Sequence, residues 1–393
     1  MCLKCGKSKN KKFILLLSLF ILIRKIILLL LKKFCKFEGT LITAWLMFAA
    51  ELLIGFFNII VEYKKLLNVG IKNFLSIPIN PNKPETRHSK LTKVLLFLLC
   101  AILDFFYFFF IYYYATKRFN NIGFLFDIRL SSFLVIFGSI ISIIIFSQKF
   151  GCCQILSIFF ILMSLIGTIA VEYKFIEIEN KFEIIKLLIF LIGSQIFSAT
   201  QYCIEKYLME YDNSTPFQIL FYEGIFGNII MVIIYFININ NKFIDKAIIE
   251  NTITLIILII GFILYFFSCI FVNIYKLTVI NFSYPTNVAT SESITIIPLF
   301  LINYFIINYF FDDAQIDKIK DMNFNTKLIY LGINCSIIII IIICNIFFNE
   351  VIMCKCKCCN NKNNRKRIRI SEDLNLGLNG LDGSFTTEGE ESF

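Results

Sequence analysis

The sequence predicts an all-α polytopic membrane protein of ten transmembrane helices in two inverted five-helix repeats. Two observations support this prediction, the composition and the number of long apolar windows. Of the 393 residues, 58% are hydrophobic and 17% are charged, and the mean hydropathy is +0.77, whereas soluble chains are roughly 45–50% apolar and about 25% charged. Ten apolar windows also approach or exceed the about 20 residues that cross a bilayer as a helix. This composition excludes a soluble enzyme with a polar surface and a disordered chain.

The ten windows follow one another with polar connections between them. Because backbone groups in lipid must be hydrogen-bonded within their own segment, each window predicts a helix. The first is the least regular, since Arg24 and Lys25 lie in its middle, and a signal anchor or an interfacial helix is the alternative there. The windows cover residues 13–31, 40–62, 93–115, 123–147, 152–171, 186–207, 217–238, 252–275, 279–309 and 328–348.

The windows fall into two halves of five. Glu51 in the second span of the first half is matched by Glu223 in the second span of the second half. Since five is odd, the halves insert in opposite orientations, which is the plan of inverted repeats. Pro285 and Pro298, on either side of Glu292, indicate a broken ninth helix. The predicted parts are a cytosolic N-terminus 1–12, repeats 13–175 and 186–350, and a disordered cytosolic Cys/Lys-rich tail 351–393.

The Lys and Arg residues predict the orientation. With a cytosolic N-terminus, the cytosolic side holds 22 of them, counting Lys149, Lys206 and Lys276, and the opposite side holds 13. Cytosolic loops carry the excess of positive charge. Both termini are therefore expected in the cytosol.

Polar residues inside the spans are the candidate substrate-binding or coupling residues, because intramembrane charge usually faces a bundle interior or a cavity. A structural alternative is that Glu51 or Asp104 pairs with Arg129, Arg24 or Lys25 to hold the bundle together, and that Glu205 lies at the membrane surface. The candidates are Glu51, Asn58, Asp104, Arg129, Gln195, Gln201, Glu205, Glu223 and Glu292. No metal site and no cofactor are expected.

Cysteines cluster at the two termini. Beside a basic segment they fit reversible S-palmitoylation. Two pairs, Cys2 with Cys5 and Cys356 with Cys359, have the spacing of a zinc clip, and functionally neutral cysteines are the third reading. The lipidation candidates are Cys354, Cys356, Cys358 and Cys359.

The stretch from Gln195 to Gly227 resembles the drug/metabolite transporter superfamily, most closely the F-type branch of solute carrier family 35. Gln195 and Gln201 followed by Glu205 look like the sixth helix of that branch, and Pro216 followed by Glu223-Gly224-Ile225-Phe226-Gly227 is similar to its seventh. Weaker matches are Met47–Glu51, Asp104 and Arg129. A departure is Glu292, because the ninth helix of that branch often carries basic residues.

The resemblance, which covers roughly residues 40–350, implies an EamA-like bundle, alternating access and a central cavity for an organic solute, in the Golgi, endoplasmic reticulum, lysosome or vacuole. Relatives carry nucleotide sugars, nucleobases, vitamins, peptides or drugs. We therefore expect a transporter and no enzyme, with a small solute and the lipid bilayer as partners, no nucleic acid, and a homodimer left open. A non-transporting scaffold or receptor is the alternative.

Glu51 and Asp104 are both expected near mid-bilayer. Two acids there cannot cheaply both be ionised without a positive partner. This favours the hypothesis that one of them carries a proton in a coupled transport cycle, with facilitated exchange as the alternative.

The orientation makes a prediction at Asn213, which opens the sequon Asn213-Ser214-Thr215 between the sixth and seventh windows. This connection is expected in the cytosol, so Asn213 carries no glycan. Endoglycosidase treatment should leave the electrophoretic mobility unchanged. A mobility shift that Asn213→Gln abolishes would contradict the predicted orientation or show that the first window does not span the membrane.

Overall fold

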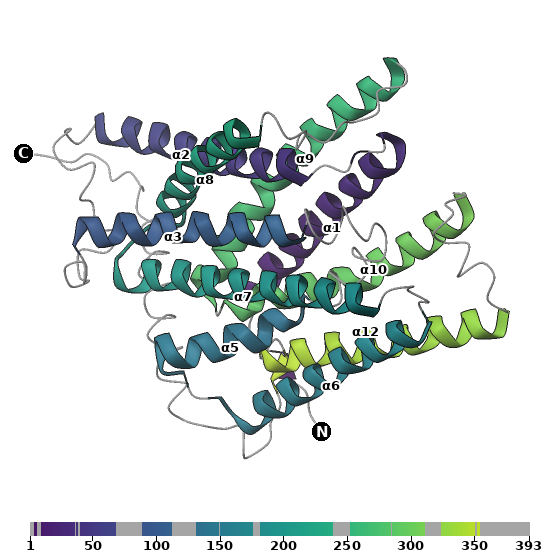
Figure 1. Cartoon of the computed structure of the whole chain (residues 1–393). Coiled ribbons are helices and arrows are strands. Elements are labelled where there is room, and N and C mark those ends of the chain that lie inside the picture. Colours follow the sequence, from purple (N-terminus) through teal and green to yellow (C-terminus); the bar gives the residue numbers. More distant parts are fainter. Residues whose placement is uncertain are drawn as a thin grey trace, which may run out of the picture.

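The computed structural model describes residues 4–5, 9–35, 37, 40–67, 89–111, 131–148, 150–175, 181–238, 252–283, 285–310, 324–349 and 352–353. Within these ranges the chain forms ten helices, which lie against one another as a bundle (Figure 1). They are α1 (Lys9–Cys35), α2 (Thr40–Leu67), α3 (Lys90–Phe108), α5 (Phe133–Phe146), α6 (Cys152–Phe175), α7 (Lys181–Tyr211), α8 (Pro216–Asn238), α9 (Thr252–Phe282), α10 (Thr286–Phe310) and α12 (Phe324–Phe348).

Seven of the described helices, α1, α2, α3, α6, α8, α9 and α12, are long and apolar enough to cross a membrane. Helix α5 has 14 residues. Helix α7 carries buried Glu205 and Lys206 among its apolar residues, and α10 begins with a polar stretch from Thr286 to Thr295. The predicted integral membrane protein of helical architecture is confirmed.

The two described ends of the chain meet. Strand β1 (Lys4–Cys5) pairs antiparallel with β2 (Ile352–Met353), so that Cys5 lies opposite Ile352. The segments before α1 and after α12 are thereby held at the same side of the bundle. The lipidation candidates Cys354, Cys356, Cys358 and Cys359 lie outside the described residues.

Three predictions for the second half are wrong: the end of the eighth window, the start of the ninth at residue 279, where α10 instead begins at Thr286, and the break in the ninth helix. The eighth window was expected to end at residue 275, but α9 continues to Phe282 because Lys276 finds a buried partner inside the bundle. The expected break in the ninth helix is also absent from the described chain: Pro285 lies in the turn before α10, and Pro298 lies inside an unbroken α10. A proline removes one backbone donor from a helix, and neighbouring helices tolerate that loss inside a membrane bundle.

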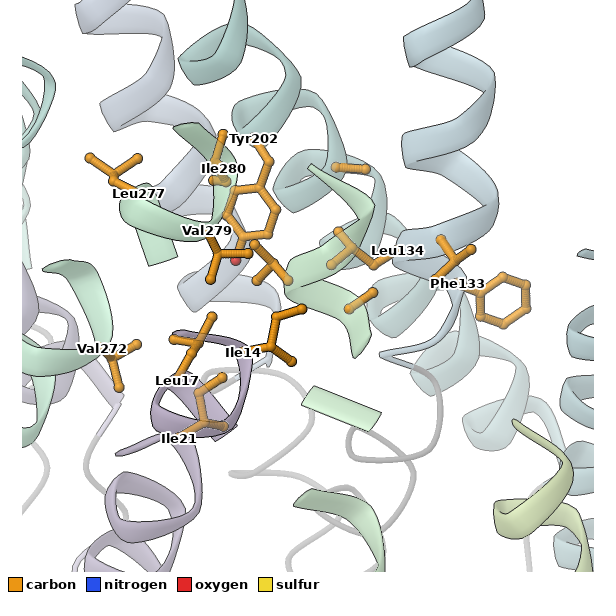
Figure 2. Packing of buried hydrophobic residues seen from close by; sticks show 14 of the residues in the cluster. Ile14, Leu17, Ile21, Phe133, Leu134, Tyr202, Val272, Leu277, Val279 and Ile280 are labelled. Carbon is orange, nitrogen blue, oxygen red and sulfur yellow. The ribbon is translucent and has the colours of Figure 1, made fainter. Parts of the chain in front are cut away.

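The core lies where helices distant in sequence pack together. Helix α1 packs along α9 and α10, α3 and α5 flank α7, and α6 runs beside α12 (Figure 1). Figure 2 shows Leu17 and Ile21 of α1 facing Val272 of α9, and the ring of Tyr202 from α7 beside Val279. These side chains are at most 7% exposed.

Helices α2 and α8 cross with their backbones close together. A β-carbon added at Gly224 would lie 2.4 Å from the Leu52 backbone nitrogen, and one added at Gly55 would lie 2.5 Å from the β-carbon of Phe221. One added at Gly227 would run into the ring of Phe48. Small residues allow membrane helices to approach this closely. The crossing brings Glu51 of α2 and Glu223 of α8 into the centre of the bundle.

Replacing Gly224 by Ala should destabilise the protein, because the added methyl group would meet backbone atoms that cannot move aside. We expect a loss of about 1–3 kcal/mol, the usual cost of overpacking, measured as a lower unfolding temperature in detergent. Gly332→Ala in α12 is the control, since no atom lies within 4 Å of its added β-carbon. Equal behaviour of the two variants would contradict the tight crossing.

Candidate functional site

Ionisable side chains from six helices gather in the middle of the bundle. Glu51, Glu205 and Glu223 are 0% exposed, Asp104 is 5% and Lys276 is 6% exposed. Each interacts electrostatically with several of the others. We call this group the central charge cluster, and its members are Arg24 (α1), Glu51 (α2), Asp104 (α3), Glu205 (α7), Glu223 (α8) and Lys276 (α9).

One ion pair anchors the cluster. Lys276 Nζ lies 3.2 Å from Glu205 Oε1. The same oxygen accepts a hydrogen bond of 2.9 Å from Gln201 Nε2, one helical turn earlier on α7, and Gln201 also lies within reach of Asp104. The Lys276 ammonium further lies 5.4 Å from the centre of the Tyr202 ring, a cation–π distance. Lys276 of α9 thus contacts two side chains of α7, Glu205 and Tyr202, and Gln201 of the same helix holds the Glu205 carboxylate.

Other acids of the cluster are less well partnered. Neither carboxyl oxygen of Glu51 has a hydrogen-bond partner among the described residues, and the same holds for Asp104 Oδ2. Glu223 lies beside the thiol of Cys100. A buried carboxylate without a hydrogen bond or a counter-charge is costly. The arrangement is therefore suited to taking up positive charge.

The remaining candidates from the sequence occupy different surroundings. Glu292, 8% exposed on α10, interacts with Tyr202, which joins it to the edge of the cluster. Gln195 is buried on α7 near Ser194, and Asn58 is half-buried on α2, two turns from Glu51. Arg129 lies outside the described residues.

Lys276 is the residue that the sequence reasoning missed. It was expected in a cytosolic loop, and it lies in α9 at the centre of the cluster. Lys206, whose position at the membrane surface beside Glu205 was an alternative, is 9% exposed and donates a hydrogen bond of 2.9 Å to the Asn281 carbonyl oxygen. The available signal was the spacing: Lys276 stands as far from Asp104 as Glu223 stands from Glu51.

A second polar network ties α5, α10 and α12 together. Asn345 of α12 donates to Ser132 at 3.3 Å and also to Ser293 of α10. Asn349 donates to Thr290 at 2.6 Å and accepts from Thr286 at 2.7 Å. Such hydrogen bonds across helices hold bundles together in lipid. We read this network as a structural contact between the helices.

The central charge cluster is enclosed in this conformation. A groove of about 310 Å³ lies elsewhere, between α5 and α6, and its lining includes Ile140, Ile143 and Ile155. Glu51, Asp104, Glu205 and Glu223 lie together among the described residues, and the predicted central cavity for a solute stays a prediction.

Comparison with known proteins adds fold information alone. No family model matches the chain, and no curated protein matches it. Among solved structures, one described only as a crystal structure of a protein aligns with a TM-score of 0.50 at 9% sequence identity. The alignment covers 87% of this chain and 99% of that one. The molecule is thus an integral membrane protein whose helical fold has a counterpart among solved structures.

The Lys276–Glu205 pair makes a stability prediction. Lys276→Met leaves the Glu205 carboxylate buried without its counter-charge, which should cost about 3–5 kcal/mol. The double variant with Glu205→Gln should recover most of that loss. Unfolding in detergent measures both.

The control is the pair of Lys206 and Glu210, 3.2 Å apart, in which Glu210 is 45% exposed. Glu210→Gln should change stability by about 1 kcal/mol or less. If the double variant at 205 and 276 loses the sum of the two single losses, the pair is not coupled.

Proposed function

We propose that the protein is a secondary transporter that moves a small organic solute across an endomembrane by alternating access, without converting the solute chemically. The observation that carries this proposal is the central charge cluster, because ionisable groups inside a membrane are expensive and mark pathways for solutes, ions or protons. The helices that supply it come from both halves of the chain. This is where the binding site of a transporter built from inverted repeats lies.

Regular spacing supports the two repeats. Helices α1 and α7 begin at Lys9 and Lys181, an interval of 172 residues, and α6 and α12 begin at Cys152 and Phe324, the same interval. It also separates Glu51 from Glu223 and Gly55 from Gly227, so that a Glu-x-x-x-Gly motif recurs at one place in each half. Five helices per half then gives the halves opposite orientations.

The packing between helices supports the same relation. Exchanging the halves turns the contact of α1 with α9 into that of α7 with α3, and both are present. The contact of α1 with α10 likewise corresponds to that of α7 with α5, and the contact of α2 with α9 corresponds to that of α8 with α3. The pairs α2–α8, α5–α10 and α6–α12 exchange into themselves.

The crossing of α2 and α8 marks the axis of this relation. Leu52 and Gly224 are themselves 172 residues apart, and they touch. A residue that touches its own equivalent must lie on a two-fold axis. Glu51 and Glu223 each precede these residues, so two equivalent acids flank the axis. Alternating access proceeds by movement of one repeat against the other around a site of this kind.

The resemblance of Gln195–Gly227 to the drug/metabolite transporter superfamily agrees with this assignment, and we propose the F-type branch of solute carrier family 35 as the family. Endomembrane location and cytosolic termini follow from the same resemblance and from the Lys and Arg bias. The second candidate is a scaffold or receptor on the same bundle. The tight Lys276–Glu205 pair favours it, because a fixed ion pair also suits a bundle that does not move.

A screen of labelled organic solutes with purified protein in sealed vesicles tests the function. The matched control is the double variant Glu205→Gln/Lys276→Met, which should fold and yet lack the ion pair that anchors the cluster. We expect at least one solute to accumulate about tenfold above the control, and to saturate. Failure of every solute, together with a specific partner that copurifies with both proteins, would favour the scaffold.

A further inference from the structure

The balance of charge in the central charge cluster is uneven. Four carboxyl groups face two basic groups, and Glu205 with Lys276 forms one close pair at 3.2 Å. Three acids then remain, Glu51, Asp104 and Glu223. The one remaining basic group, Arg24, interacts with Glu51 and Asp104. With every group ionised, the cluster has a negative surplus at the centre of the membrane.

Glu51 is an acid of the cluster whose negative charge is poorly compensated. It is 0% exposed, and neither of its oxygens has a hydrogen-bond partner among the described residues. The charged and titratable groups that face it from the neighbouring helices are Asp104 on α3, Glu205 on α7, Glu223 on α8, Lys276 and Cys269 on α9, and Arg24 on α1. Three of these are acids and two are basic, and Lys276 is already paired with Glu205, so the neighbours do not neutralise Glu51.

A buried carboxyl group in such a place has two stable conditions. It holds a proton, or it lies against a positive charge, because the isolated carboxylate is too costly in a medium without water. A proton and a cationic solute therefore compete for the same oxygens. Binding of one releases the other.

We propose that the central charge cluster binds a solute through a positively charged nitrogen, held between Glu51 and Asp104, and that the solute takes the place of protons carried by these carboxyl groups. One proton leaves for each positive charge that enters, so the charge of the site is unchanged. The exchange across the membrane rests on the proposed transport function, whereas the binding step does not. The inference narrows the solute to organic cations and disfavours nucleotide sugars, whose phosphates would add to the negative surplus.

The protein contains its own example of this recognition. The Lys276 ammonium lies against the Glu205 carboxylate and at 5.4 Å from the Tyr202 ring centre, a combination of carboxylate and aromatic face that suits alkylammonium groups. A metal ion is a poorer fit, because no three His, Cys, Asp or Glu side chains in the described part of the chain converge closely enough to hold one.

The test uses purified full-length protein in detergent and a graded set of probes. These are tetramethylammonium to tetrabutylammonium, benzyltrimethylammonium, its neutral carbon isostere neopentylbenzene, and benzoate. Unfolding temperature reports binding, and a pH indicator in weak buffer reports released protons. We expect at least one ammonium ion to stabilise the protein saturably and to release about one proton per ion bound. Its affinity should fall about tenfold per unit of decreasing pH once the carboxyl groups take up protons.

Glu51→Gln and Asp104→Asn test the assigned residues. Each should weaken ammonium binding about 10- to 100-fold, because the cation loses one buried counter-charge, and should reduce the pH dependence. Neutralising Glu51 removes no hydrogen-bond partner from a described residue, so this variant should fold. Glu210→Gln, an exposed acid outside the cluster, is the control and should bind like the unchanged protein.

The outcomes separate the inference from the proposed function. Equal binding of neopentylbenzene, stabilisation by benzoate alone, no response to any ammonium ion, or unchanged affinity in both cluster variants would each overturn the cationic assignment. Uptake of a neutral or anionic solute in vesicles would then leave transport standing. Ammonium binding with proton release, but without movement across the vesicle membrane, would support the site and count against transport.

Discussion

The Lys276–Glu205 pair is the contact on which the interior of this protein depends. Inside a membrane no water is present to solvate a charge, so each one must be met by another side chain or neutralised. The 3.2 Å approach of the two groups, with Gln201 on the same oxygen, fixes the height of α9 against α7. Helices α1 and α3, which pack on α9 and α7, are positioned by the same contact.

Close backbone packing supplies the other half of the arrangement. Gly55, Gly224 and Gly227 let α2 and α8 approach until backbone meets backbone, and this brings Glu51 and Glu223 within range of the pair. With larger residues at these places the two acids would stand farther from Lys276. The electrostatics of the centre thus depend on positions that carry no charge.

The sequence predicted the helices well, because a run of about 20 apolar residues has few alternatives to spanning a bilayer. It also predicted the buried acids and the Gln201–Glu205 face of α7, since a helical period places these residues on one side. It failed for Lys276, because a single lysine beside a turn looks the same whether the helix ends before it or after it. The contacts of Asn345 with Ser132 and Ser293 were missed as well, since uncharged polar residues are ordinary in membrane helices and their partners lie far away in the sequence.

The meeting of Leu52 with Gly224 has a consequence for how the two halves diverge. In the proposed repeat, a residue on the axis contacts the equivalent residue of the other half. A change of side-chain size at one of the two positions therefore alters the packing of the other. Away from the axis, the copies are free to become different. Asp104 and Lys276 occupy equivalent positions and carry opposite charges. The two halves of the proposed repeat thus place a negative and a positive charge at equivalent positions. Two identical halves would place the same charge at both.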